Sequence, residues 1–412
     1  MEKEILAALE IADHEVRLLV GQFYNGRLNI LKVEQVSHKG VSSYSIISEN
    51  LVVEAILKAV ENASRNLGVV IEKVLLVVPG IQTKHTTKQM QIPITGKVSD
   101  LDIKRAYREL IESKAMDDYV LTNVMMSKYF VNGSSTRKLP LNERCTHLTI
   151  EADCYYSRQS IIFPYLSAVE ASGLKIIDIV LDDIGLAKEA ALFESSIDKP
   201  IIVYTLARSL SKMTLYYKGK LLSTDYETEG LNKFLDLLAN DLGIPKDAVE
   251  NLLYYNTNLM EIKPKEDPIF IWSYRGQTHT VSDKDLAELL NDSFKEYLLE
   301  LLNRSEPIFE LGQPNILVTG SGSVIEGIKE FLEGESNAIV EQYRSMTFGI
   351  KEPSLSSVVG AFYYYKDQAV FRYESDFSAN KIELEASILK DKDEHEDESM
   401  TQKLKKIFFE KV

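Results

Sequence analysis

Apolar side chains follow the period of a β-strand in three runs near the start of the chain. The runs cover residues 5–11, 16–22 and 28–36, and the dipeptide Asn25-Gly26 separates the second run from the third. Asn-Gly between two strand-like runs is typical of a tight hairpin turn, because both residues accept positive φ angles. The pattern therefore predicts a small antiparallel sheet.

A helix and a further strand are predicted next. Residues 51–67 place Val52, Ile56 and Ala63 on one helical face, as expected for an amphipathic helix that packs on a sheet. Residues 75–78 form a short apolar run that ends at Pro79-Gly80. This run indicates a buried strand.

A similar order of elements returns after Pro200. The strand-like runs are residues 201–203, 213–217 and 221–226, the turn is Lys218-Gly219, and the helix is 231–242, closed by Gly243. Both halves thus begin with strands, a glycine turn and a helix in the same order, which favours a duplicated α/β domain. The alternative is that such runs occur in any α/β protein.

Residues 84–165 break this order. The pattern predicts a helix over 99–113 capped by Ser99, strands over 148–156 and 160–163, and then a helix over 165–172 and a strand over 175–181. Ser at the N-cap followed by acidic residues in the first turn is typical of a helix start. We therefore predict an inserted subdomain at 84–165.

Composition limits the classes of function. A chain of 412 residues with 45% hydrophobic side chains is large enough for two or more domains, and its net charge of −15 argues against nucleic-acid binding. Cys145, His147 and Cys154 lack the paired spacing of a zinc site, so no metal is predicted. No signal peptide and no apolar stretch of about 18 residues are readable. These features predict a cytoplasmic protein.

The end of the chain differs in character from the rest. Residues 391–398 are strongly acidic, and residues 401–412 carry four Lys against one Glu. We predict a disordered acidic linker over 376–398 and an amphipathic membrane-binding helix over 399–412. The predicted membrane contacts are Met400, Lys403, Leu404, Lys405, Lys406, Ile407, Phe408 and Phe409. The alternative is a helix that packs back on its own domain.

Three stretches in this order resemble the FtsA family of bacterial cell-division proteins, which are actin-like. Residues 9–16 are similar to the opening phosphate hairpin of the family, residues 173–181 to the strand that returns from its inserted subdomain, and residues 316–327 to its adenosine motif. Residues 356–360 are similar to its closing helix, and the amphipathic end completes the resemblance.

The resemblance implies an α/β, actin-like two-lobe fold made of duplicated ribonuclease-H-like domains, with an inserted subdomain in the first lobe and a C-terminal amphipathic helix. The implied boundaries are 1–83 with 166–200 for the first lobe, 84–165 for the insertion, 201–230 with 311–375 for the second-lobe core, 231–310 for its outer subdomain, 376–398 for the linker and 399–412 for the membrane helix.

The resemblance also implies a nucleotide site, from which this sequence departs. Ala12 and Glu15 replace the glycine and lysine of the first hairpin, and residues 205–210 match the glycine-rich second hairpin without any glycine. The matching positions that are retained are Glu10, Gly320, Ser321 and Gly322. ATP with Mg²⁺ is therefore expected to bind weakly or not at all. In the simpler alternatives, the glycines form a strand-to-helix turn and Glu10 is a solvated or paired carboxylate.

As function, the resemblance implies a scaffold that polymerises, tethers FtsZ filaments to the cytoplasmic membrane and recruits later division proteins through residues 84–165. The FtsZ C-terminal peptide would contact Lys284, Lys295 and Glu296 within 231–310. Its other partners would be further copies of itself and anionic lipids, at the division site. Two alternatives stay open: an ATP-dependent actin-like switch, or an adaptor of the pilus-assembly type.

Overall fold

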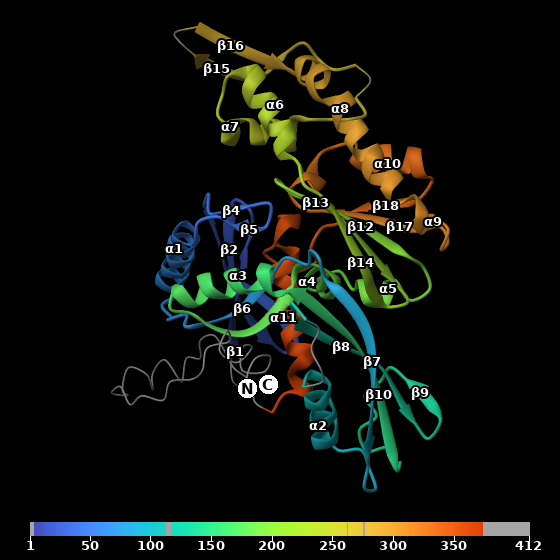
Figure 1. Ribbon diagram of the computed structural model, residues 1–412. Helices are drawn as coiled ribbons and strands as arrows, with labels where there is room; N and C mark the ends of the chain where they lie inside the picture. Colours follow the sequence, from blue (N-terminus) through green and yellow to red (C-terminus); the bar gives the residue numbers. More distant parts are fainter. Residues whose placement is uncertain (1–3, 113–116, 262, 275–276, 374–412) are drawn as a thin grey trace. The chain divides into compact units, whose positions relative to one another are not determined.

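The computed structural model describes residues 4–112, 117–261, 263–274 and 277–373, and Figure 1 shows their course. The predicted linker 376–398 and the predicted membrane helix 399–412 lie outside these residues. The chain divides into two compact units, which are residues 1–191 with 347–350 and 356–412, and residues 192–346 with 351–355. Within the described residues, no helix is both long and apolar enough to cross a membrane.

The first unit contains a five-stranded sheet of order β11-β6-β1-β2-β3. Its strands are β1 (Glu4–Ile11), β2 (Glu15–Tyr24), β3 (Arg27–Ser37), β6 (Lys73–Val78) and β11 (Lys175–Leu181). The first three are antiparallel, whereas β6 lies parallel to β1 and to β11. The predicted Asn25-Gly26 turn joins β2 to β3, and both of its residues have positive φ. Helix α1 (Glu49–Leu67) packs on β2 and β3, and α11 (Ser356–Asp367) packs on β1, β2 and β6.

The second unit repeats this sheet. Its order is β14-β13-β12-β17-β18, with β12, β13 and β14 antiparallel and with β17 and β18 parallel to β12. The strands are β12 (Ile201–Leu206), β13 (Ser211–Tyr217), β14 (Lys220–Glu227), β17 (Asn315–Thr319) and β18 (Ile339–Gln342). Equal strand order and equal strand directions confirm the duplicated α/β arrangement that the sequence pattern predicted.

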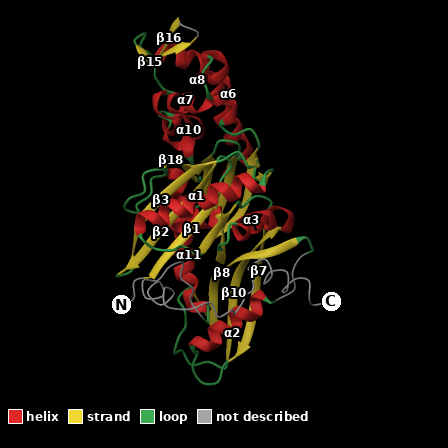
Figure 2. Ribbon diagram, turned by 90° about the vertical axis from the view of Figure 1, so that its left-hand side faces the viewer, coloured by secondary structure: helices red, strands yellow, loops and turns green. Residues whose placement is uncertain are grey.

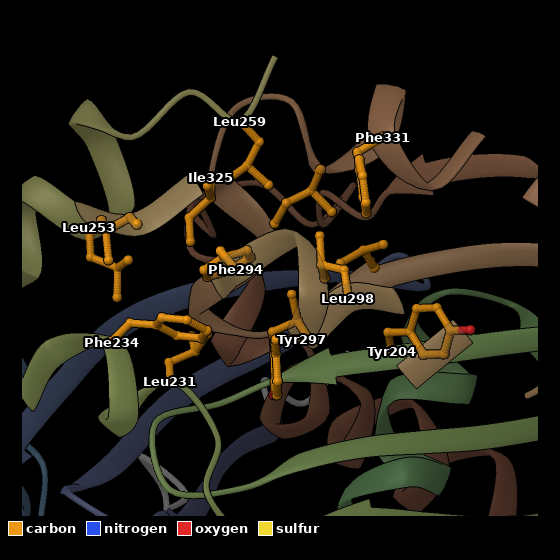
Figure 3. Packing of buried hydrophobic residues seen from close by; sticks show 14 of the residues in the cluster. Tyr204, Leu231, Phe234, Leu253, Leu259, Phe294, Tyr297, Leu298, Ile325 and Phe331 are labelled. Atoms are coloured by element: carbon orange, nitrogen blue, oxygen red, sulfur yellow. The ribbon is translucent and has the colours of Figure 1, made fainter. Parts of the chain in front are cut away.

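Aromatic side chains organise the core of the second unit (Figure 3). Phe234 of α6 (Asn232–Leu242) lies 4.6 Å from Phe294 and 5.5 Å from Tyr297, measured between ring centroids. Phe294 and Tyr297 belong to α8 (Asp283–Arg304). Such ring pairs contribute about 0.5–1.5 kcal/mol beyond the burial of their area. They fix α8 against α6 above the sheet.

The inserted residues form a separate four-stranded sheet of order β7-β10-β8-β9, which Figure 2 shows from the side. Its elements are β7 (Lys84–Pro93), α2 (Asp100–Ile111), β8 (Tyr119–Val131), β9 (Ser134–Thr136) and β10 (His147–Arg158). Ser99 caps α2 through a reciprocal pair of hydrogen bonds with Asp102. Cys145 and Cys154 are buried in the core between α2 and this sheet.

One predicted strand is wrong. Residues 160–163 belong to the helix α3 (Gln159–Ala171), not to a strand. Two isoleucines and a phenylalanine directly before a proline are typical of an extended segment, because proline disfavours the helical conformation of the residue before it. However, Ile162, Leu166 and Val169 share one helical face and are all buried. Burial of this face outweighs the local preference.

The shorter elements complete both units. They are β4 (Val41–Ser42), β5 (Ser45–Ile46), α4 (Asp182–Glu189), α5 (Leu192–Ser195), α7 (Lys246–Asn251), a π-helical turn (Leu252–Asn256), β15 (Pro268–Tyr274), β16 (Gln277–Ser282), α9 (Glu306–Phe309) and α10 (Ile328–Ser336), with 3₁₀ turns at Ser321–Val324, Pro353–Leu355 and Gln368–Phe371.

Helices α4 and α11 cross at two glycines. A Cβ on Gly360 would overlap the carbonyl oxygen of Gly185, and a Cβ on Gly185 would overlap the carbonyl oxygen of Ser357. Only glycine permits backbones to approach this closely. The crossing fixes α11, whose Val358 and Phe362 are fully buried.

We predict that Gly360→Ala lowers the free energy of unfolding by at least about 1–3 kcal/mol, because the added methyl group overpacks this crossing. Gly334→Ala is the matched control, since Gly334 lies in α10 and a Cβ there meets nothing within 4 Å. The control should raise the free energy of unfolding by about 0.5–1 kcal/mol. Urea unfolding followed by circular dichroism measures both changes, and equal effects of the two substitutions would refute the assignment.

Candidate functional site: two equivalent hairpins

The two units carry hairpins of the same construction. In the first unit, Ile11 pairs with Val16, and the N–H of Ala12 donates to the carbonyl oxygen of Glu15 at 2.9 Å. In the second unit, Leu206 pairs with Ser211, and the N–H of Ala207 donates to the carbonyl oxygen of Leu210 at 3.2 Å. The loops therefore have equal length and equal closing hydrogen bonds.

Equal registers also align the side chains that flank the loops. Glu10 pairs with Arg17 across the first hairpin, and Thr205 pairs with Lys212 across the second. Each hairpin thus places a buried basic residue at the same position, since Arg17 is 7% exposed and Lys212 is 1% exposed. None of residues 12–15 and 207–210 has a positive φ, so these loops adopt conformations that do not require glycine.

In the first hairpin, Arg17 lies between two carboxylates. Its Nη1 is 2.9 Å from Glu10 Oε2, and its Nε is 2.7 Å from Glu15 Oε1. Gln35 of the neighbouring strand β3 also donates to Glu15. Two unit charges about 4 Å apart attract by about 4 kcal/mol at an effective dielectric of 20. Glu10 is therefore a paired carboxylate in this structure.

The charges shift one another's protonation. Burial alone would raise the pKa of Glu15, but Arg17, His14 and Gln35 together outweigh burial, and the pKa of Glu15 is lowered. Burial opposes the positive charge on Arg17, whereas Glu10 and Glu15 favour it, and the pKa of Arg17 is raised. Glu15 and Arg17 therefore stay charged together at neutral pH.

Further carboxylates gather at the carboxyl ends of the parallel strands of the same sheet. Asp182, directly after β11, accepts hydrogen bonds from the N–H groups of Gly80 and Asp183, both at 2.8 Å. Asp13, Asp182 and Asp183 are at least 91% buried. Burial, together with the charges of Asp13 and Asp182, raises the pKa of Tyr44 well above its ordinary value. This end of the sheet repels phosphate unless a cation is added.

The loop of the second hairpin is hydrogen-bonded to the start of α6 in the same unit. The carbonyl oxygens of Ala207 and Arg208 accept the N–H groups of Leu231 and Asn232, at 3.0 and 2.6 Å. Leu210 is 1% exposed, and Arg208 Nη1 lies 3.8 Å from Glu250. The loop therefore presents an arginine, but its backbone carbonyls cap the start of α6.

The predicted adenosine loop packs against this hairpin. Gly320 has φ +84°, and a Cβ there would lie 2.6 Å from the carbonyl oxygen of Leu206. A Cβ on Gly322 would lie 2.6 Å from a methyl carbon of Leu231, and Ser321 begins a 3₁₀ turn. Both glycines are thus required for packing inside the second unit. The structure brings Gly320, Ser321 and Gly322 to the second hairpin, whereas Glu10 belongs to the first unit.

The predicted partner residues lie along α8. Lys284, in its first turn, pairs with Glu266 at 3.0 Å, while Lys295 is half-buried and Glu296 is exposed. A helix rises about 1.5 Å per residue, so Lys284 and Lys295 are roughly 16 Å apart along the axis. They could bracket an extended peptide, but they do not form one compact pocket. Among the described residues, no group of three or more His, Cys, Asp or Glu could hold a metal ion.

Several curated proteins to which the chain is similar are FtsA proteins. The chain is 19% identical to the cell-division protein FtsA of Staphylococcus epidermidis over 368 residues, which are 87% of this chain and 78% of that protein. It is 21% identical to FtsA of Bacillus subtilis, covering 87% and 82% of the two chains, and 21% identical to FtsA of Escherichia coli, covering 89% and 91%. The chain is a divergent relative of FtsA. No protein-family model matches it.

Solved structures agree on the fold. A chain of the PilM–PilN type IV pilus biogenesis complex matches 87% of this relative of FtsA and 98% of its own length, with 13% identity and a TM-score of 0.56. MreB5 of Spiroplasma citri, solved with bound ADP, matches 89% and 97%, with 11% identity and a TM-score of 0.50. This relative of FtsA therefore has the actin-like fold.

Sequence reasoning missed Arg17 and the pair Asp182-Asp183. The predicted strands end at residue 11 and begin again at residue 16, which leaves a four-residue loop. If residues 11 and 16 pair, then Arg17 lies opposite Glu10, so the sequence could have placed these two side chains together. The aspartates directly follow a strand that was predicted correctly, and a carboxyl end of a parallel strand is a usual place for polar site residues.

We predict that Arg17→Met lowers the stability of β1 and β2 by about 3–5 kcal/mol, because two carboxylates that are only 13% exposed lose their counter-charge. Arg65→Met is the control: its partner Glu61 and Arg65 itself are 68% and 69% exposed, so the loss should stay below about 1 kcal/mol. Native-state hydrogen exchange of the β1 and β2 amides measures both.

The loss of stability in Arg17→Met should depend on pH. The folded-state pKa of Glu15 is lowered, so its contribution is present above the pKa of an unfolded glutamate, about 4.3. That contribution is lost as the pH falls through the folded-state value. The difference between wild type and Arg17→Met should therefore shrink in acid, and a difference that grows there would contradict the ion-pair account.

Proposed function

We propose that this protein is a division scaffold of the FtsA type. In this proposal it assembles into actin-like filaments and tethers FtsZ filaments to the inner face of the cytoplasmic membrane at the division site. Later division proteins would bind residues 84–165, which form a separate sheet with its own helix. The observation that carries the proposal is the similarity to FtsA over 87% of the chain, including both halves of the duplication and the insertion.

The membrane part of the proposal rests on the sequence of residues 399–412. Four apolar side chains on one face contribute roughly 1.5–3 kcal/mol each when buried, and each lysine near anionic lipid adds about 1 kcal/mol. Ordering about a dozen residues costs about 1–2 kcal/mol each. A single helix should therefore bind weakly, and an assembly with several copies should bind firmly. Filament formation and membrane binding would then support each other.

A catalytic role has less support. In the first hairpin, two carboxylates neutralise Arg17 and further acids surround the strand ends, and in the second hairpin the backbone caps a helix. Phosphoryl transfer depends on positioned donors and on added positive charge. We propose that any ATP with Mg²⁺ that this protein binds is structural.

The pilus-type adaptor is the second candidate. The similarity to the PilM–PilN complex supports the fold only, at 13% identity. The cationic amphipathic residues 399–412 favour the division scaffold, because such a segment beyond an acidic linker is typical of membrane binding.

We predict that the protein carries FtsZ filaments onto vesicles that contain phosphatidylglycerol. Leu404→Glu with Phe408→Glu should reduce membrane partition at least about 100-fold, because two apolar side chains are lost from the inserted face. Lys284→Glu with Lys295→Glu should leave the protein on the vesicles but release FtsZ. Vesicle flotation with quantification of both proteins measures these outcomes.

The matched control for the membrane variant is Ile47→Glu with Leu101→Glu. Both side chains are exposed on the folded first unit, at 66% and 65%, so the same chemical change there should leave flotation unchanged. Flotation that survives Leu404→Glu with Phe408→Glu would refute the membrane helix. FtsZ that stays bound to the lysine variant would refute docking along α8.

We also predict that the purified protein does not turn over ATP in the presence of Mg²⁺, with or without vesicles, because two carboxylates pair with Arg17 in the first hairpin and the second hairpin contains no glycine. Glu10→Ala should behave like the wild type in a phosphate-release assay. Magnesium-dependent turnover that disappears in Glu10→Ala would show that the site is catalytic and would favour the ATP-dependent switch.

A further inference from the structure

The last described residues of the chain complete the core of the inserted subdomain. After α11, the 3₁₀ turn Gln368–Phe371 leads to Arg372 and Tyr373, and we call residues 368–373 the exit segment. Phe371 is 8% exposed and belongs to the hydrophobic cluster of the inserted sheet. Its ring stacks on Tyr107 of α2, with ring centroids 5.3 Å apart and an interplanar angle of 20°. A side chain from outside 84–165 thus fills the core under α2.

The neighbouring residues hold the exit segment on two sides. Arg372 forms an ion pair with Asp178 of β11, and its guanidinium carbon lies 4.1 Å from the ring centroid of Tyr365 in α11. The ring of Tyr373 lies 4.4 Å from the guanidinium of Arg108 in α2. Arg372 has an extended backbone, with φ −99° and ψ 150°, so successive side chains point to opposite sides. Phe371 and Tyr373 contact α2, and Arg372 contacts the first-lobe sheet and α11.

Apart from the exit segment, an amide side chain ties the inserted sheet to the first-lobe sheet. Asn123 of β8 donates from Nδ2 to the carbonyl oxygen of Ile179 at 2.9 Å, and its Oδ1 accepts the N–H of Leu181 at 3.1 Å. Asn123 is 1% exposed. This tie holds β8, whereas α2 lies between β7 and the exit segment. The position of α2 therefore depends on residues 368–373 as well as on the inserted sheet.

We propose that the exit segment is a coupling strap between α2 and the residues that follow position 373. Lifting the strap removes Phe371 from the core and exposes the apolar side of α2, so the closed strap and a well-packed α2 stabilise each other. Coupling of this kind is reciprocal, because each partner must change the stability of the other by the same factor. A force or a binding event on residues 374–412 then changes the stability of α2, and a partner bound at α2 changes the stability of the exit segment. The proposal does not require membrane or FtsZ binding.

Because the coupling is reciprocal, it can be tested from both sides by hydrogen exchange of the full chain, measured by mass spectrometry. Phe371→Ala should speed exchange of the α2 amides at least about tenfold, since a core side chain is lost. Tyr107→Ala, on the opposite side of the contact, should speed exchange of the amides of residues 368–373 by a similar factor. Phe371→Leu keeps most of the volume and should give a smaller effect, which guards against failure to fold.

Phe23→Ala is the matched control. Phe23 contacts α11 through Tyr363, with ring centroids 6.1 Å apart, and it lies outside the α2 cluster, so α2 exchange should not change. The amides of α8, in the second unit, report global unfolding and should stay constant throughout. The coupling is overturned if α2 is unaffected by Phe371→Ala, if Tyr107→Ala leaves the exit segment unaffected, or if α8 changes equally.

Discussion

The close crossing of α4 and α11 is the constraint on which the first unit depends. Because neither Gly185 nor Gly360 has a Cβ, α11 lies directly against the helix that follows β11. That position brings Phe362 into the sheet core and Phe371 into the core of the inserted subdomain. Two residues without side chains therefore determine where several large side chains, in two different cores, are placed.

The two hairpins share one backbone arrangement but differ in the contacts that their side chains and loop carbonyls make. Register and loop length are the same, and both place a buried basic residue next to the loop. In the first hairpin two glutamates surround that residue, whereas in the second the opposing residue is Thr205 and the loop carbonyls bind the start of α6. Contacts within the protein thus pair the charges of the first hairpin and engage the loop carbonyls of the second, whereas a phosphate loop offers its backbone N–H groups to the ligand.

The sequence predicted the repeated elements well because their signals are local. The strand over 175–181 has the observed bounds, and the helices over 51–67 and 231–242 differ from α1 and α6 by two residues or fewer. The strands β7 and β8 were not predicted, because they mix polar and apolar residues without a clear alternation. Such a strand can be recognised only once the strands that pair with it are known. The helix α3 was misassigned because its burial is a tertiary effect.

The candidate site was predictable only in part for the same reason. Glu10 and Gly320–Gly322 could be found from short motifs, but the ion pair that occupies Glu10 depends on strand register, and the role of Gly320 depends on its contact with Leu206. The contact of Phe371 with Tyr107 joins positions far apart in the chain, and no local pattern predicts it.

The amide of Asn123 has a consequence for how such an architecture can arise. The side chain of Asn123 gives β11 one donor and one acceptor, as the backbone of a neighbouring strand would. The edge of the first-lobe sheet is therefore covered at this point, although no further strand pairs with it. Asn123 thus joins the two sheets through a side chain, not through a shared ladder of strands. A module attached in this way can be exchanged for another of different shape, provided that the incoming chain supplies a comparable amide and a place for Phe371, and the host sheet need not be rebuilt.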